Sequence, residues 1–304
     1  MSVSPAPRPA STVVILRPAP QGTQVFMLRR PQQMAAFAGA WVFPGGKLDS
    51  ADSSERATAR LRVSADEAPF HSVRDYSGRP VDAARARAYW CAACRETFEE
   101  SGILLAQRSE GGSCSRAELA ALRNSRPAML ADGEQFYAAL EARDLVIPAR
   151  ALIHWSHWVT PSISALRFDT HFFLAIVPEG TRAARDPRET AVARWRPLVT
   201  LARVARAVPP QLLGPTAITL IDIENALCAN GGPAELERLS RQRHDVPLVP
   251  KVCEEDGRGW AVMPWDPDYV RIPGEGDAVP PAHQAQFANL PPRLPLPATW
   301  RPPR

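Results

Sequence analysis

The sequence predicts an α/β fold, in which short β-strands alternate with helices around a mixed sheet. Two observations carry this prediction. Short segments rich in β-branched and aromatic residues recur along the chain, and longer amphipathic segments lie between them. The expected strands are residues 11–16, 25–29, 42–47, 103–106, 153–160 and 167–177.

Helices are expected at residues 83–101, 116–123, 132–143, 197–208 and 215–229. The first has Asp82 as its N-cap and Gly102 directly after its last turn, and these residue types commonly begin and end helices. Along it Trp90, Cys94 and Phe98 share one side, together with Ser101. We therefore expect that side to pack in a core.

Three carboxylates crowd another side of the same helix. Residues 95–103 read RETFEESGI, so Glu96, Glu99 and Glu100 occupy positions i, i+3 and i+4 of one face. Like charges so placed repel by roughly 0.2–0.5 kcal/mol per pair unless a cation lies between them. Oxygen ligands at close quarters suit a hard cation such as Mg²⁺ or Mn²⁺. A solvated acidic face is the alternative for this motif taken alone.

The segment upstream favours the metal site. Residues 41–49 read WVFPGGKLD, an apolar strand that leads into a turn, where Gly45 and Gly46 permit close approach of a substrate to the backbone. Together the two segments resemble the Nudix box, G-x5-E-x7-R-E-U-x-E-E-x-G-U, where U is a bulky apolar residue. Gly46 matches the first glycine, and Asp52 stands where the family usually has glutamate. The second half is matched in order by Arg95, Glu96, Glu99, Glu100, Gly102 and Ile103.

Two departures from the motif stand out. Thr97 takes the first apolar position, and 42 residues instead of seven separate Asp52 from Arg95. The free energy of loop closure rises only with the logarithm of loop length, so the longer gap costs roughly 1.5 kcal/mol. We therefore expect an insertion, at about residues 53–81, that extends the helix backwards without changing its register. Its polar part is expected to cover the substrate cleft.

One branch of the Nudix superfamily carries such an insertion, namely the enzymes that resemble the mammalian peroxisomal acyl-coenzyme A diphosphatase. Residues 153–161 (IHWSHWVTP) and 167–174 (RFDTHFFL) resemble this branch as well, and rough counterparts extend the similarity over residues 11–270. The resemblance implies a Nudix α/β/α sandwich. The resemblance and the many prolines near the end together predict four segments. These are a flexible N-terminus (1–10), a Nudix domain (11–205), a C-terminal extension packed on it (206–272) and a proline-rich tail that is extended on the surface or disordered (273–304).

The resemblance also implies roles for individual residues. Nudix enzymes hydrolyse a diphosphate that links a nucleoside to another group, and metal ions neutralise the phosphates and acidify the attacking water. Glu99 and Glu100 are then metal ligands, joined by Glu96 and the Gly45 carbonyl. Arg95 is expected to hold a box glutamate through charge-assisted hydrogen bonds.

Two assignments have alternatives. The general base is either Glu96 or Glu189, a loop glutamate six residues before Trp195. Arg29 and Arg30 precede the box and are candidates for phosphate binding. Only one of two adjacent strand residues faces a given side, so at most one of the two arginines is expected in the cleft.

Branch resemblance favours coenzyme A or an acyl-coenzyme A as the substrate, cleaved to 3′,5′-ADP and 4′-phosphopantetheine or its acyl form. The same box residues occur in enzymes that act on ADP-ribose, NADH or nucleoside triphosphates, and these substrates are alternatives. A nucleotide-binding sensor without catalysis is a third alternative. The three glutamates oppose it, whereas Asp52 and Thr97 are the signs in its favour.

Composition narrows the partners and the compartment. A net charge of +4 and a pI near 9.0 suit a small anionic substrate. Basic residues form no run with interleaved aromatics, and no apolar run approaches the roughly 18 residues that span a bilayer, so neither nucleic acid nor membrane is an expected partner. Five cysteines without a pairing pattern and a terminus without a secretory signal favour the cytoplasm. The oligomeric state is open, with a homodimer as one alternative.

Two further patterns resemble metal sites. Cys91 and Cys94 form a CxxC pair, but the chain offers no second pair, so ordinary core packing is expected. His154, His157 and His171 lie close together in the sequence. Because residues of a strand alternate between its two faces, His154 and His157 should point away from each other, which argues against a zinc site.

Overall fold

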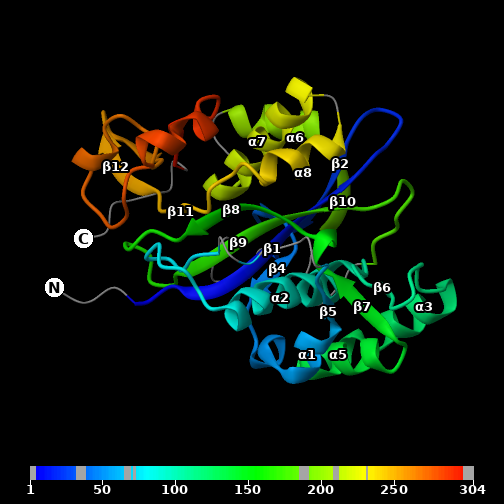
Figure 1. The fold of residues 1–304 in the computed structure, drawn as a ribbon. Coiled ribbons are helices and arrows are strands. Elements are labelled where there is room, and N and C mark those ends of the chain that lie inside the picture. Colours follow the sequence, from blue (N-terminus) through cyan, green and yellow to red (C-terminus); the bar gives the residue numbers. More distant parts are fainter. Residues whose placement is uncertain are drawn as a thin grey trace.

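A mixed eight-stranded sheet forms the middle layer of the molecule (Figure 1). The structure is a computed structural model that describes residues 5–31, 39–64, 70, 73–184, 192–207, 212–230 and 232–296. In spatial order the sheet contains β10 (Val192–Pro197), β2 (Gln24–Arg29), β1 (Arg8–Arg17), β9 (Phe168–Ile176), β8 (Ile153–Val159) and β11 (Pro247–Leu248), with β3 (Trp41–Val42) paired to β2 and β4 (Gly45–Lys47) paired to β1. The β1–β9 and β8–β11 pairs are parallel, and the other pairs are antiparallel.

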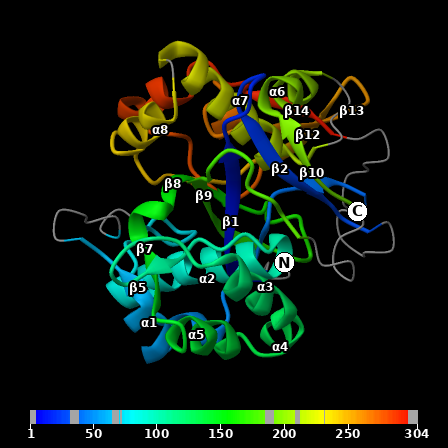
Figure 2. The same ribbon diagram turned by 90° about the vertical axis from the view of Figure 1, so that its right-hand side faces the viewer.

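Strand β1 shows why helices cover both faces of this sheet. Val13 and Ile15 point to one hydrophobic core, whereas Val14 and Leu16 point to the other, and all four are buried. A strand that is apolar on both faces needs cover on both. Figures 1 and 2 show the two helical layers, with α2 (Ala83–Ser101) on one side and α6 (Leu198–Arg206), α7 (Gly214–Asn230) and α8 (Pro233–Ser240) on the other. The expected α/β/α sandwich is confirmed.

Helix α2 has the predicted bounds and caps. The Asp82 carboxylate accepts a hydrogen bond from the Arg85 N–H at 2.7 Å, and Gly102 ends the helix in the left-handed conformation, with φ of 64°. Trp90, Cys94 and Phe98 are fully buried in the core between α2 and the sheet. Cys91 lies in the same core, so ordinary packing accounts for the CxxC pair.

The described part of the insertion belongs to the core layer around α2. It follows the 3-10 helix η1 (Ser50–Ser53) and contains α1 (Glu55–Arg60) and β5 (Leu61–Arg62), which pairs with β7 (Leu145–Pro148). Ala57, Leu61 and Val73 are buried in the core cluster that contains Trp90. These apolar residues support the core, and the expectation that the polar part of the insertion covers the substrate cleft stays a prediction. Residues 65–69 and 71–72 lie outside the described part.

Beside α2 the chain forms three more helices and a small sheet. These elements are α3 (Arg116–Asn124), α4 (Arg126–Ala131), α5 (Glu134–Glu141), the 3-10 helix η2 (Ala149–Ala151) and β6 (Gln107–Arg108), in the sheet order β5-β7-β6. The expected strand at residues 103–106 is wrong. Ile103 and Leu105 leave the left-handed turn at Gly102 as irregular chain with buried side chains, and pairing begins only at Gln107.

The C-terminal residues pack on the opposite face of the main sheet. The strands β12 (Lys251–Glu255), β13 (Arg258–Val262) and β14 (Arg293–Pro295) form a second three-stranded sheet, accompanied by the 3-10 helices η3 (Tyr269–Arg271) and η4 (Pro281–Phe287). Val279, Phe287 and Leu294 are buried in the core that α7 shares with β1. The expectation of an extended or disordered segment from residue 273 is therefore wrong up to residue 296, because apolar residues between the prolines anchor it. Residues 297–304 lie outside the described part.

The N-terminal boundary also differs from the expectation. Strand β1 begins at Arg8, and Arg8, Pro9 and Ala10 pair with the start of β9, so a flexible terminus over residues 1–10 is wrong for these three. Residues 1–4 lie outside the described part. Among the described residues, no helix is both long enough and apolar enough to span a membrane.

Candidate active site

The glycine turn of the box lies directly against the glutamate face of α2. A Cβ atom on Gly46 would lie 2.5 Å from the Glu96 carboxylate, and one on Gly45 would lie 2.4 Å from the Ser11 carbonyl oxygen. At Gly45 the neighbour is backbone, so the turn requires glycine there, whereas a side chain at Gly46 would displace the Glu96 carboxylate. The Gly45 N–H donates to Oε2 of Glu100 at 3.0 Å, which ties the turn to the last glutamate.

The two halves of the box meet through a buried ion pair. The Arg95 guanidinium donates from Nε to Oδ1 and from Nη2 to Oδ2 of Asp52, at 2.8 and 2.9 Å, although 42 residues separate the two in sequence. Asp52 also accepts the Asp49 N–H at 2.7 Å and the Tyr137 hydroxyl at 2.6 Å. This bidentate pair fixes both the distance and the orientation between the turn and the helix.

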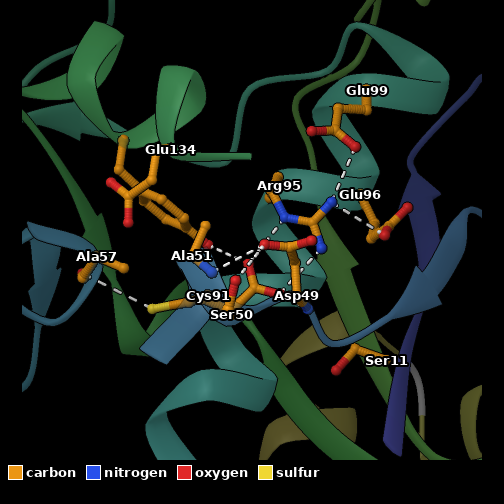
Figure 3. Close-up of polar contacts among 12 residues, drawn as sticks. Ser11, Asp49, Ser50, Ala51, Ala57, Cys91, Arg95, Glu96, Glu99 and Glu134 are labelled. Atoms are coloured by element: carbon orange, nitrogen blue, oxygen red, sulfur yellow. Dashed lines mark hydrogen bonds and ion pairs between the residues drawn. The ribbon is translucent and has the colours of Figure 1, made fainter. Parts of the chain in front are cut away.

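Arg95 also holds the glutamates of its own helix (Figure 3). Its Nη1 donates to Glu96 at 3.0 Å and to Glu99 at 2.9 Å, and its Nη2 donates to the Lys47 carbonyl at 3.2 Å. Burial lowers the pKa of Arg95, but hydrogen bonds to Asp52 and the charges of the glutamates outweigh it and raise the pKa well above its usual range. The guanidinium is therefore a permanent cation among the carboxylates.

Glu99 is the carboxylate most perturbed by its surroundings. Its burial, with a smaller contribution from the charge of Glu96, raises the pKa of Glu99 to about 8 against the opposing effect of Arg95. One of its oxygens, Oε1, is buried and has no hydrogen-bond partner in the described part of the chain. The carboxylates carry more negative charge than Arg95 alone can balance. Oxygen donors grouped in this way suit a hard divalent cation, which Glu96, Glu99 and Glu100 could hold.

The other predicted residues are placed as follows. Alternate residues Phe26 and Leu28 of β2 face the core around α2, so Arg30 continues on that side and Arg29 lies on the opposite face. The Arg29 side chain donates to the Gly39 carbonyl at 3.2 Å. Arg30 has a buried Nε atom without a partner in the described ranges. Glu189 lies outside the described residues.

Two supporting residues escaped the sequence reasoning. Tyr137 of α5 reaches Asp52, and Arg126 of α4 donates to the Glu99 carbonyl at 2.9 Å. Arg126 also donates to the Ala184 carbonyl, and the Ala184 N–H donates to the Ser101 carbonyl at 2.7 Å. These contacts join residues remote in sequence, and no local spacing could have indicated them.

A hollow of about 440 Å³ is lined by residues of β1, β2, β10 and the segment 181–183. Phe26 and Trp195 form its apolar wall, and the Arg17 guanidinium lies over the Trp195 ring at 4.0 Å. Arg182 and Arg194 also line it. The chemistry of this lining, with three cations and an aromatic wall, suits an anionic ligand that carries a ring or an apolar group.

Comparisons with known proteins agree with this geometry. The chain is 29% identical over 218 residues to the human protein named acyl-coenzyme A diphosphatase NUDT19. This alignment covers 62% of this chain and 57% of the human protein. It is 26% identical over 198 residues to the protein of the same name from Xenopus laevis, which covers 57% of this chain and 52% of that one. The chain thus spans about half the length of the curated relatives it matches. A NUDIX hydrolase from Alicyclobacillus acidocaldarius superposes with a TM-score of 0.59 at 25% identity, over 79% of this chain and 97% of that chain.

The family relationship rests on a match to a family of Nudix domains. The family described as the NUDT19 Nudix domain matches residues 6–207, which is most of the chain and includes both halves of the box. Together with the assembled turn and helix, this match shows that the chain belongs to the NUDT19 Nudix domain family.

Proposed function

We propose that the protein is a metal-dependent diphosphatase that hydrolyses coenzyme A or an acyl-coenzyme A to 3′,5′-ADP and 4′-phosphopantetheine or its acyl form. The observation that carries this proposal is the Asp52–Arg95 pair, which joins the two halves of the box across the insertion. The names of the human and Xenopus relatives support coenzyme A as the substrate.

The residues divide the chemistry between them. Bound Mg²⁺ or Mn²⁺ would neutralise diphosphate oxygens and acidify the attacking water. Glu99 and Glu100 would hold the metal with Glu96 and the Gly45 carbonyl. Arg95 keeps the carboxylates converged, because its guanidinium contacts Glu96 and Glu99 at once. Glu96 or Glu189 would accept the proton of the attacking water.

The arginine-lined hollow supports a substrate with an additional phosphate. Coenzyme A carries a 3′-phosphate that ADP-ribose and NADH lack, and Arg182 and Arg194 could bind this dianion in the hollow that they line with Trp195. A single arginine–phosphate interaction contributes roughly 1.5–3 kcal/mol. Loss of the 3′-phosphate should then reduce kcat/KM by about ten- to a hundredfold.

A substrate panel tests the proposal. The purified chain is assayed with Mg²⁺ and with Mn²⁺ against coenzyme A, acetyl-coenzyme A, dephospho-coenzyme A, ADP-ribose, NADH and nucleoside triphosphates. Coenzyme A or its acetyl ester should have the highest kcat/KM. If ADP-ribose or NADH were hydrolysed faster than coenzyme A, that compound would be the substrate instead. If nucleotides were bound but not hydrolysed, the protein would be a nucleotide sensor and not an enzyme.

Variants locate the 3′-phosphate contact. Arg182→Gln and Arg194→Gln should narrow the difference between coenzyme A and dephospho-coenzyme A, whereas the control Arg203→Gln, an exposed arginine of α6, should not. Unchanged discrimination in both variants would exclude the hollow as the phosphate subsite without affecting the assignment of the box.

A further inference from the structure

A second buried polar cluster lies on the sheet face that α2 covers. This histidine cluster consists of His154 and His157 of β8, Asp169 and His171 of β9, and Asp245 before β11. His171 contacts Tyr89 of α2, with ring centroids 4.2 Å apart. The cluster shares no residue with the box and joins two strands to the C-terminal segment.

An irregularity in β8 brings the histidines together. His154 pairs with Phe173 of β9, but Ser156 pairs with the adjacent Phe172, so one residue of β8 is extra. This β-bulge shifts the alternation of side chains by one position. His154 and His157 therefore point to the same face, and the expectation from a regular strand that they point apart is wrong.

Three atoms of this cluster converge as metal ligands do. Nε2 of His154 lies 2.9 Å from Nδ1 of His171 and 3.9 Å from Oδ1 of Asp245, and one ligand atom from each of the three residues lies within 4.8 Å of the others. Ligand atoms around tetrahedral zinc, with bonds of roughly 2.0–2.1 Å, are about 3.3 Å apart. The observed separations bracket that value, so small side-chain movements would admit an ion.

The surrounding contacts orient two ligand atoms, and the third needs a change of tautomer. Nε2 of His171 lies 3.2 Å from the Arg74 carbonyl, which can only accept, so this nitrogen carries the proton and Nδ1 keeps its lone pair. In the metal-free protein that lone pair accepts the Nε2–H of His154, and zinc binding would move the His154 proton to Nδ1. Oδ2 of Asp245 accepts the Arg74 N–H at 2.7 Å. Its other oxygen, Oδ1, is buried and lies 3.4 Å from Nδ1 of His157 and 3.9 Å from Nε2 of His154. Backbone groups that orient a histidine and a carboxylate in this way are typical of the surroundings of metal ligands.

A different combination of the same residues is a poor chelate. Ligand atoms of His157, Asp169 and His171 also lie within 4.8 Å of one another. However, the rings of His157 and His171 are stacked, with centroids 4.1 Å apart and an interplanar angle of 20°. Lone pairs in nearly parallel ring planes do not converge on one ion. His157 instead contacts Asp169 and forms an ion pair with Asp245 at 3.4 Å.

We propose that His154, His171 and Asp245 bind a zinc ion through three protein ligands, distinct from the Mg²⁺ or Mn²⁺ of the box. Two imidazole nitrogens and one carboxylate oxygen suit zinc, whereas Mg²⁺ prefers oxygen ligands alone. The ion would link the strands to Asp245 and, through the backbone of Arg74, to the insertion.

Metal content and cobalt spectroscopy test this site on the full chain. The protein is stripped with a chelator, titrated with ZnCl₂ or CoCl₂ under reducing conditions, and analysed for bound metal, visible cobalt absorption and melting temperature. Wild type should bind one zinc per chain, raise its melting temperature with Zn²⁺, and give the intense ligand-field bands of a low-symmetry cobalt site. His154→Gln, His171→Gln and Asp245→Asn should each weaken zinc binding by about a hundredfold.

Matched variants separate this site from other metal ligands. The double variant Glu99→Gln/Glu100→Gln removes carboxylates of the box, and His244→Gln removes an exposed histidine next to Asp245. Both should keep the zinc and the cobalt bands. The proposal is overturned if wild type binds neither metal, since this result is independent of whether the variants fold. It is also overturned if the double variant loses the zinc while His154→Gln and Asp245→Asn keep it.

Discussion

The carboxylate cluster of the box and the histidine cluster occupy the same face of one sheet, yet they are built differently. The first takes its oxygen donors from one turn of α2 and the glycine turn, and it contains its own cation, Arg95. The second takes nitrogen and oxygen donors from two strands and a distant C-terminal segment. Donor type would therefore separate the two proposed metal sites, because oxygen donors alone suit a hard cation and mixed nitrogen and oxygen donors suit zinc.

The insertion connects the two clusters. Its first part follows Asp52 and supports α2 through Ala57 and Leu61, and its last part brings the Arg74 backbone to Asp245 and His171. An inserted segment that contributes to the core at one end and to a polar cluster at the other is an integral part of this fold. The predictions that follow separate the contributions of these regions.

Removal of Asp52 should have the largest effect. Asp52→Ala leaves the Arg95 guanidinium buried without its bidentate partner, and breaking a buried pair in this way costs about 3–5 kcal/mol. Urea unfolding should report this loss, and the exposed Glu141→Gln variant serves as the control. A loss below about 1 kcal/mol, the range of exposed pairs, would show that the pair does not hold the box together.

Neutralising the proposed metal ligands should remove activity and leave stability intact. Glu99→Gln or Glu100→Gln should lower kcat by about a hundredfold or more, because an amide is a weaker ligand than a carboxylate for a hard cation. Circular dichroism should show a folded protein. The metal-free melting temperature should not fall, because Glu100→Gln removes a repelling charge and Glu99, with its pKa raised to about 8, carries little charge at neutral pH. Near wild-type turnover of either variant at saturating Mg²⁺ would refute its role as a ligand.

The insertion can be tested at a single buried side chain. Leu61→Ala should lower the free energy of unfolding by about 2–3 kcal/mol, since it leaves a cavity beneath α2. The exposed neighbour Arg62→Ala is the matched control. If Leu61→Ala instead changed KM for coenzyme A with no change in stability, the insertion would act on the cleft as the sequence suggested.

The smallest predicted effect is a pH dependence of the metal-free protein. Burial raises the pKa of folded Glu99 from 4.5 to about 8, so between these values the folded chain holds a proton that the unfolded chain lacks. The stabilisation from this group is present at low pH and is lost as the pH rises through about 8. Urea unfolding in EDTA should show the decline, and Glu99→Gln should reduce it. An identical slope in the variant would assign the effect to other groups.

The sequence predicted the features that depend on local spacing. The caps of α2, its apolar side and the box glutamates follow from residues within a few turns of one another, and the structure has them together. The packing of the C-terminal segment was missed because its many prolines predict an irregular chain. Phe287 and Leu294 in this segment are buried only by contact with remote elements. The histidine cluster was missed because a bulge in β8 leaves no signature in the strand pattern.

The segment that contains Arg243 and Asp245 contacts side chains on both faces of strand β8. The Arg243 guanidinium lies 3.7 Å from the ring centre of Trp155 in the core shared with α7, whereas Asp245 contacts the histidines on the other face. Sliding β8 by one residue would break both contacts at once, and the parallel pairing of β11 to His157 and Trp158 as well. The C-terminal region thus fixes the register of β8. A chain truncated before residue 243 should keep its secondary structure but pair β8 with β9 in more than one register.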